Sequence, residues 1–242
     1  MRYAIISDIH SNLEALTTVL AHIENNKVDN ILCLGDIVGY GPNPNECVEL
    51  VKSNCLKVIA GNHDVACIDI SEAEYFNYFA KQAIFWTGDN LTDSSRSFIS
   101  QLPLHEEIEN AYLVHASPDN PADWNYVTSI VEAKFSFLYF DNQICFIGHS
   151  HVPIIYVKTV DNKVNESEKN YLTIETNERY LINIGSVGQP RDNNPDAAYA
   201  ILDTDKKEYQ LIRVPYDYKE TQKKMVEQNL PFFLIERLRN GR

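Results

Sequence analysis

The apolar and polar positions of the first 150 residues alternate between two kinds of segment. Short apolar runs at 2–7, 31–34 and 57–60 have the length of a strand, and each is followed by a polar or glycine-containing group. The stretches between them, 12–25 and 44–53, predict helices, and leucine and isoleucine recur at helical spacing in the first of them. Strands that alternate with helices in this way are typical of an α/β fold.

The middle of the chain adds an inserted segment and two further strands. Residues 69–102 spread aromatic side chains among polar ones, which predicts one or two inserted helices whose aromatic residues form a core face rather than a substrate cap. Strands are predicted at 112–115 and 144–147, and a loop at 117–129 and a helix at about 130–140 separate them.

The last third of the chain has a different pattern, in which short strand-like runs are separated by polar turns. These runs predict a second, largely antiparallel sheet, and they lie at 154–160, 171–175, 180–184, 198–202 and 209–214. Residues 217–239 predict one or two surface helices. Two β layers with helices outside follow from this order of elements, and the absence of any Gly, Pro or Ser-rich linker predicts one domain over 1–242.

Charge and cysteine content exclude several classes of function. A formal net charge of −13 argues against general attraction to nucleic acid or anionic lipid, because a polyanion requires a basic patch. The five cysteines form no C-x-x-C pair, so buried reduced thiols are expected instead of a disulfide framework or a zinc ribbon. The chain shows no signal peptide and no apolar segment of spanning length, which predicts a cytoplasmic protein.

Chemistry-bearing residues are concentrated in five short segments. Five of the seven histidines fall inside them, and three of the segments directly follow the first predicted strands, whose carboxyl ends should converge on one crevice. The side chains offer oxygen and imidazole nitrogen without thiolate, which suits Mn²⁺, Fe²⁺ or Zn²⁺. The segments are Asp8-Ile9-His10, Gly35-Asp36, Gly61-Asn62-His63-Asp64, His115 and Gly148-His149-Ser150-His151.

The order and chemistry of these segments resemble the calcineurin-like metallophosphoesterases. Gly39-Tyr40-Gly41-Pro42 and Gly188-Gln189-Pro190-Arg191 are similar to a bacterial branch that groups phosphodiesterases with diadenosine tetraphosphatase-like enzymes. The resemblance implies a four-layer α/β/β/α sandwich, with two mixed sheets flanked by helices, and two divalent metal ions. It implies that the first ion takes Asp8, His10, Asp36 and His151, and that the second takes Asp36, Asn62, His115 and His149.

The resemblance also implies roles for residues beside the ligands. His63 would protonate the leaving oxygen or stabilise the transition state, and Asp64 would orient His63. Three residues are candidates for substrate binding: Arg191 as a phosphate clamp, Tyr40 as part of the crevice wall, and Asn12, which also suits a helix N-cap. Trp124 and Tyr126 are expected to pack in the core or a lid, with stacking on a base as the alternative, whereas His22 and His105 are expected to be structural.

The leading hypothesis is therefore hydrolysis of a small-molecule phosphoester, and specifically of a phosphodiester, by attack of a hydroxide shared between two metal ions. Two alternatives remain open for the same ligand set. The protein is then a phosphomonoesterase, or it is a hydrolase of nucleotides or dinucleoside polyphosphates. A third alternative belongs to another class, a protein-interaction scaffold with a vestigial metal site. The sequence leaves the native metal, the substrate and the oligomeric state open.

Overall fold

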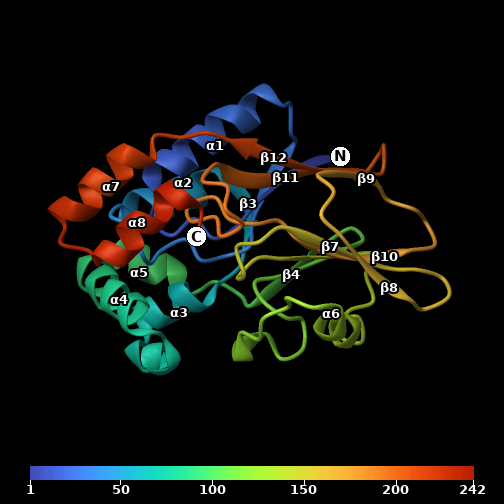
Figure 1. Cartoon of the computed structure of the whole chain (residues 1–242), viewed down its shortest axis with the longest axis horizontal. Coiled ribbons are helices and arrows are strands. Elements are labelled where there is room, and N and C mark those ends of the chain that lie inside the picture. Colours follow the sequence, from blue (N-terminus) through green and yellow to red (C-terminus); the bar gives the residue numbers. More distant parts are fainter.

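Twelve mostly short, apolar strands pair into two six-stranded sheets in the computed structural model, which describes all 242 residues (Figure 1). The first sheet has the order β3-β2-β1-β11-β12-β9. Its strands are β1 (Arg2–Ile6), β2 (Asn30–Cys33), β3 (Cys55–Val58), β9 (Tyr171–Thr173), β11 (Ala197–Asp203) and β12 (Glu208–Val214). The second sheet has the order β4-β5-β6-β10-β7-β8. Its strands are β4 (His105–Ile108), β5 (Ala111–Val114), β6 (Ile144–Ile147), β7 (Ile154–Lys158), β8 (Val164–Ser167) and β10 (Arg179–Asn183).

Both sheets are mixed. In the first, β1, β2 and β3 are parallel, whereas β11 pairs antiparallel with β1. In the second, β5, β6 and β10 are parallel, and β7 pairs antiparallel with β10. The predicted four-layer architecture with two mixed sheets is confirmed.

The late strands correct one prediction, because they do not form a separate antiparallel sheet. β9, β11 and β12 complete the first sheet, while β7, β8 and β10 complete the second. All seven residues of β11 are buried, so both of its faces are covered and it belongs in the middle of a sheet. Strand β8 was not predicted from the sequence.

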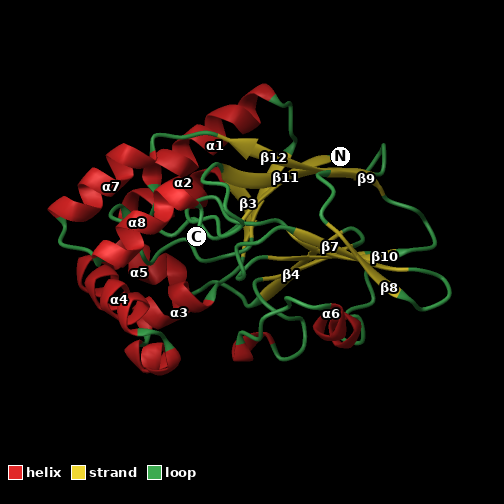
Figure 2. Cartoon of the chain, viewed as in Figure 1, coloured by secondary structure: helices red, strands yellow, loops and turns green.

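The helices cover the outer faces of the sheets and one end of the sandwich (Figure 2). In the order of the chain they are α1 (Leu13–Asn25), α2 (Pro44–Asn54), α3 (Asn62–Ile68), α4 (Tyr78–Asn90), α5 (Asp93–Ile99), α6 (Ile130–Ser136), α7 (Tyr218–Glu227) and α8 (Phe232–Asn240). Two 3₁₀ turns, η1 (Ile70–Tyr75) and η2 (Pro121–Asp123), complete the list. None of these helices combines the length and the apolar character that a membrane span requires.

Apolar side chains fill the spaces between these layers. One core lies between the two sheets and includes Ile5, Leu113 and Phe146. A second core lies on the far face of the first sheet, where Leu16 and Ile23 of α1 pack, and a third lies between the second sheet and α6. These contacts fix the relative positions of the strand ends, where the candidate functional residues lie.

The inserted segment and the chain terminus are helical, as predicted. The insertion forms η1, α4 and α5, and the terminal segment forms α7 and α8. The two terminal helices are more than a surface layer, because they share a small apolar cluster with α4 and with Tyr40. That contact brings the end of the chain close to the site described below.

Candidate metal centre

Five strand ends from the two sheets deliver the predicted ligands to one place. Asp8 follows β1 and Asp36 follows β2, while Asn62 begins α3 just after β3. His115 follows β5, and the segment with His149 and His151 follows β6. Parallel strands end at a common edge, so the pairing within each sheet places these residues together at one end of the sandwich.

The first ligand cluster consists of Asp8, His10, Asp36 and His151, whose ligand atoms all lie within 4.8 Å of one another. Nε2 of His151 is 3.2 Å from Oδ1 of Asp8 and 3.1 Å from Nε2 of His10. Two imidazole nitrogens and two carboxylates therefore face one point, and all four residues are buried. A divalent cation fits this donor set.

The second ligand cluster consists of Asp36, His115 and His149, again within 4.8 Å. Oδ2 of Asp36 is 3.3 Å from Nε2 of His115 and 3.5 Å from Nε2 of His10 in the first cluster. The same carboxylate oxygen thus faces both clusters, the position that a bridging ligand requires. The other oxygen, Oδ1, accepts a hydrogen bond of 2.8 Å from the backbone N–H of His63, which fixes the carboxylate.

Several ligand atoms are buried without a hydrogen-bond partner. They are Oδ2 of Asp36, Oδ1 of Asn62, and Nε2 of His115 and His149. A buried polar atom without a partner is costly, and cations bound by the clusters would satisfy these atoms. The free amide oxygen of Asn62 is consistent with the prediction that it binds the second ion.

Backbone carbonyl groups orient three of the imidazoles. Nδ1 of His10 lies 3.2 Å from the oxygen of Val38, Nδ1 of His115 lies 2.7 Å from that of Leu34, and Nδ1 of His151 lies 2.6 Å from that of Gln189. A carbonyl oxygen can only accept, so each Nδ1 carries the proton and each Nε2 presents a lone pair to the cluster. This arrangement is typical of imidazoles that bind metals.

The backbone of the clusters is unusual as well. Five of the seven predicted ligands have a positive φ, with values of 50° to 65°, although none is glycine: Asp8, His10, Asp36, His149 and His151. Such conformations are disfavoured for residues with a Cβ and are concentrated at functional sites. The fold here stabilises a strained arrangement that directs side chains toward a common centre.

The carboxylates keep their negative charge despite burial. Burial alone would raise the pKa of Asp36, yet His115 and His63 hold the pKa of that carboxyl well below its usual range. Burial would likewise lower the pKa of His115, but Asp36 and Asp8 raise it to about 9. For His149, burial together with His115 outweighs the effect of Asp36 and lowers its pKa to about 3. The centre therefore combines two anionic carboxylates with imidazoles that differ in protonation, because the carboxylates favour the protonated form of His115 and burial favours the neutral form of His149.

His63 lies beside the clusters and has a free nitrogen. Its ring centroid is 4.7 Å from that of His10 and 4.4 Å from that of Tyr40, and its Nδ1 is buried without a partner. Burial lowers its pKa to about 4. The side chain lines the cleft described below, so it is available to a substrate.

Asp64 does not orient His63, which corrects the prediction. Its carboxylate accepts hydrogen bonds from the backbone N–H groups of Gly61 at 3.0 Å and Val38 at 3.1 Å. His63 and Asp64 both belong to α3, a helix not predicted from the sequence, in which neighbouring side chains point about 100° apart. Asp64 instead joins the start of α3 to the loop after Asp36.

The three predicted substrate residues lie in different surroundings. Tyr40 lines the cleft, and its hydroxyl group lies 3.4 Å from Nη2 of Arg191. Asn12 is buried and fully engaged: it caps α1, donates 2.8 Å to the oxygen of Gly188, and accepts from Thr221. Its predicted role in substrate binding is therefore not supported, and it connects α1 with α7 and with the loop that contains Gly188.

The two remaining histidines lie away from the clusters. His22 forms a hydrogen bond with the hydroxyl group of Tyr199, and the ring of His105 stacks on that of Tyr112.

A cleft of ≈ 640 Å³ opens beside Asn62, His63 and His149. Aromatic residues from two loops line it: Tyr75 and Phe76 from the insertion, and Trp124 and Tyr126 from the loop after β5. The ring of Tyr126 stacks on His149 at 4.0 Å, and Tyr75 is 93% exposed. The prediction that the aromatic residues of the insertion form a core face is wrong for Tyr75, whose exposure at the end of a 3₁₀ turn has no periodic signal, but it holds for Phe76, which lines the cleft and also packs against the core.

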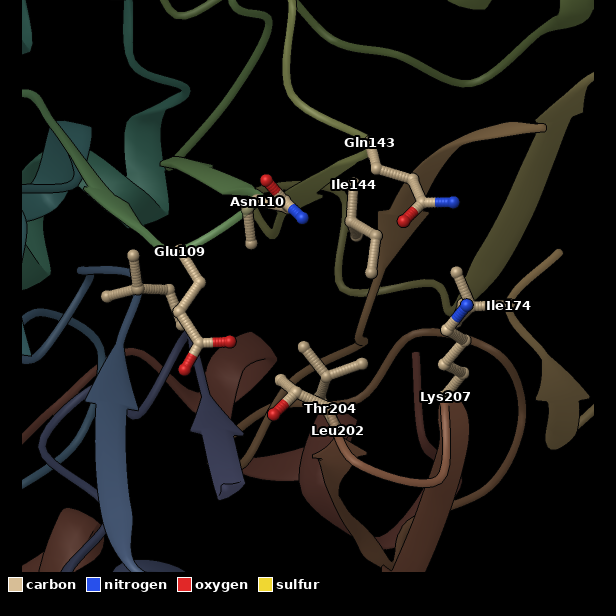
Figure 3. A pocket seen from close by; sticks show the side chains of 10 residues that line it. Glu109, Asn110, Gln143, Ile144, Ile174, Leu202, Thr204 and Lys207 are labelled. Carbon is tan, nitrogen blue, oxygen red and sulfur yellow. The ribbon is translucent and has the colours of Figure 1, made fainter. Parts of the chain in front are cut away.

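A second cavity lies at the opposite end of the sandwich and lacks these groups. It measures ≈ 130 Å³ and is bordered by the starts of β5 and β6 and the end of β11 (Figure 3). Its labelled side chains include Glu109, Gln143, Thr204 and Lys207 but no histidine. This cavity therefore offers no site for the metal-ligand chemistry described above.

Replacing Gly61 by alanine should disturb the centre without unfolding the protein. A Cβ on Gly61 would overlap the carboxylate of Asp36, and such overpacking typically costs about 1–3 kcal/mol. We expect Gly61→Ala to bind less metal per chain, as measured by elemental analysis after dialysis. Gly88→Ala is the control, because a Cβ there meets only the carbonyl oxygen of Cys67 at 3.3 Å. Equal metal content in the two variants would contradict this role of Gly61.

Known proteins have a similar sequence and fold. A sequence profile described as "Calcineurin-like phosphoesterase superfamily domain" matches residues 1–207. Uncharacterized protein MJ0912 of Methanocaldococcus jannaschii is 41% identical over 99% of this chain and 98% of its own length. The crystal structure of a metallophosphoesterase from Sphaerobacter thermophilus superposes with a TM-score of 0.89 at 40% identity, covering 100% of this chain and 99% of the other.

A more distant structure shares the fold. Hypothetical protein PH1004 of Pyrococcus horikoshii OT3 has a TM-score of 0.83 at 21% identity, and the match covers 100% of this chain and 98% of that one. With the ligand clusters at the carboxyl ends of the strands, the family match over most of the sequence and the similarity of the whole fold, the chain belongs to the calcineurin-like phosphoesterase superfamily.

Proposed function

We propose that the protein is a phosphodiesterase that uses two divalent metal ions, Mn²⁺, Fe²⁺ or Zn²⁺, to hydrolyse a small-molecule phosphoester. The observation that carries this proposal is the pair of ligand clusters that share Asp36 and open, beside His63, onto a cleft. When bound, the two ions supply a nucleophile derived from water near neutral pH and positive charge for the phosphoryl oxygens.

His63 is the residue that would deliver a proton to the leaving oxygen. Its Nδ1 has no partner within the protein, and its ring forms part of the cleft wall. Burial lowers the pKa of His63 to about 4, and the negative charge of an adjacent phosphoester would favour the protonated form. A proton held in this way is readily transferred to a departing alkoxide.

The shape of the cleft supports a diester over a monoester. A phosphodiester has two organic substituents, and the cleft extends from the metal-ligand clusters along the aromatic side chains far enough to hold a substituent of considerable size. Its negative charges, Glu72 and Asp123, lie among those aromatic residues. An uncharged, flat substituent therefore fits this part of the cleft better than an anionic one.

Removing the metals should abolish hydrolysis, and Mn²⁺ should restore it. We would treat the protein with a chelator, remove the chelator, and assay bis-p-nitrophenyl phosphate and p-nitrophenyl phosphate with and without added Mn²⁺. The expected result is no activity without metal and a higher kcat/KM for the diester with metal. Asp36→Asn protein purified in the same way controls for contaminating phosphatases.

Three outcomes would contradict parts of the proposal. Full activity in the metal-free protein would exclude metal-dependent catalysis. A protein that binds no metal and hydrolyses neither ester would favour the alternative of a scaffold with a vestigial site. A higher kcat/KM for the monoester would support a phosphoesterase but show that its preferred substrate is a monoester and not a diester.

A further inference from the structure

We propose that Arg191 and Arg237 form a cation pair at the edge of the candidate metal centre and bind a second phosphoryl group of the substrate, next to the one that is hydrolysed. The inference rests on the proposed function and narrows its substrate class. Arg237 belongs to α8, beyond the residues that match the family profile, and no motif points to it. The favoured substrate is then a phosphodiester that carries another phosphoryl group.

Arg191 is fixed beside the first ligand cluster. Its backbone N–H donates to the oxygen of His151 at 3.2 Å, and its Nη2 donates to Oε1 of Gln189 at 3.0 Å. The guanidinium carbon lies 5.8 Å from the centroid of the Tyr40 ring. Nε of Arg191 is buried without a partner, so the side chain retains a donor for a ligand.

The end of α8 is attached to the loop that directly follows Arg191. The backbone N–H of Asn193 donates to the oxygen of Gly241 at 2.8 Å, and Nε of Arg242 donates to Oδ1 of Asn193 at 3.0 Å. Gly241 ends the helix with φ 61°, and a Cβ there would lie 2.6 Å from the backbone of Asn194. Figure 1 shows this end of the chain among the loops near the middle of the molecule.

The same helix also packs against the wall of the cleft. Leu234 and Leu238 of α8 share an apolar cluster with Tyr40, the residue whose hydroxyl contacts Arg191. Arg237 precedes Leu238 and lies with its guanidinium 5.4 Å from the ring centroid of Phe233. Its Nε donates to the oxygen of Arg242, and its two terminal nitrogens have no partner within the protein. The contacts of α8 with Tyr40 and with the loop after Arg191 thus place the helix that carries Arg237 next to Arg191.

Neither arginine is neutralised by a carboxylate side chain. The arginines that form such ion pairs are Arg2, Arg213 and Arg239. Burial, and then the neighbouring Arg191, lowers the pKa of Arg237 to about 10. Two guanidinium groups that repel each other in a partly buried position are stabilised by an anion between them.

A phosphoryl group is the anion that best fits the pair. Guanidinium groups bind phosphate through two parallel hydrogen bonds, a geometry that lysine cannot reproduce. The metal ions would already serve the phosphoryl group under attack, which leaves the arginines for a further negative group. Within the aromatic cleft, Glu72 and Asp123 would repel that group. The anionic part of the substrate therefore lies toward Arg191 and Arg237, and its uncharged substituent lies toward the aromatic residues.

The test compares a ligand with one phosphoryl group and a ligand with two. We would titrate orthophosphate and methylenediphosphonate into the full-length protein in a buffer saturated with Mn²⁺ and measure the heat of binding. The wild-type protein should bind the diphosphonate at least about tenfold more tightly, since a hydrogen bond to a charged group contributes about 1.5–3 kcal/mol. In Arg237→Ala this preference should disappear, while orthophosphate binding changes less than about twofold.

The same helix offers a matched control. Arg239 is exposed and pairs with Glu236 at 2.8 Å, so Arg239→Ala removes the same charge from α8 without touching the site and should keep the preference. Arg237→Gln retains a donor for the oxygen of Arg242 but has no charge, and it should lose the preference with an unchanged melting temperature. Arg237→Gln replaces Arg237→Ala in this test if the alanine variant folds poorly. Because the same solutions are used for every protein, complexation of Mn²⁺ by the ligand affects all of them equally.

The outcomes separate this inference from the proposed function. Equal affinity of the wild-type protein for both ligands, or an unchanged preference in Arg237→Gln, would overturn the cation pair even if diesters are hydrolysed normally. Loss of the preference in both Arg237 variants and its retention in Arg239→Ala would support the pair. That result would stand even if no ester were hydrolysed, in which case only the proposed function would fail.

Discussion

Replacing Asp36 by asparagine should remove both metal ions, whereas replacing Asp8 should remove one. Oδ2 of Asp36 faces His10 in the first cluster and His115 in the second, while Asp8 belongs to the first cluster alone. An amide bridges two cations poorly and carries no negative charge to offset theirs. We expect affinity to fall by more than the ~10–100-fold that is typical when only an outer partner of a metal ligand is lost.

The measurement is the metal content per chain after equilibrium dialysis against a fixed concentration of Mn²⁺. Asp8→Asn should retain about one ion fewer than the wild-type protein, and Asp36→Asn should retain essentially none. Hydrolysis of a diester should be lost in both variants, so metal content and not activity distinguishes them. Undiminished occupancy in Asp36→Asn would show that this carboxylate is not the bridge.

The positions of the ligands follow from local features of the sequence. Asp8, Asp36 and Asn62 come directly after short apolar strands, and parallel pairing of those strands brings their ends together without further information. The orientation of each side chain is harder to predict. Five ligands adopt a positive φ that no glycine signals, because the surrounding fold stabilises this strain.

Long-range contacts explain where sequence reasoning failed. The strands near the end of the chain pair with much earlier ones, for example Ala200 with Ile5 and Asn183 with Ile147, and strand pairing of this kind leaves no local pattern. The role of Asp64 was predicted wrongly because the unpredicted helix α3 turns its carboxylate away from His63. Arg237 was missed because its position depends on the attachment of α8 to the loop near Asn193.

The aromatic cleft shows the same limitation. Tyr75 and Tyr126 come from two loops separated in sequence, and nothing in their spacing indicates that they face a common space. Aromatic residues are found far more often in cores than in substrate sites, so the sequence favours the core. A useful signal was nevertheless present: both loops adjoin ligand segments, one after Asn62 and the other after His115.

Replacing His63 by alanine should leave both metal ions in place and reduce turnover by about 10²–10⁴-fold, the usual effect of losing a general acid. The side chain lies in the cleft wall with Nδ1 free, and the hydrogen bond from His63 to a predicted ligand comes from its backbone N–H, which donates to Oδ1 of Asp36. Truncation of the side chain preserves that backbone contact. Metal content should therefore equal that of the wild-type protein, which separates this variant from the Asp36 variant.

The size of the defect should depend on the leaving group. A p-nitrophenolate departs without a proton, whereas an alkoxide does not, so the loss in kcat should increase with the pKa of the leaving alcohol. We would measure kcat for a series of aryl and alkyl diesters with the wild-type protein, His63→Ala and His63→Gln, and with His105→Ala as an exposed control distant from the site. Glutamine retains a hydrogen-bond donor but cannot transfer a proton, so it should fail with poor leaving groups as alanine does. If His63→Ala lost the same fraction of kcat for all leaving groups and His63→Gln recovered it, His63 would instead stabilise charge on the phosphoryl oxygens.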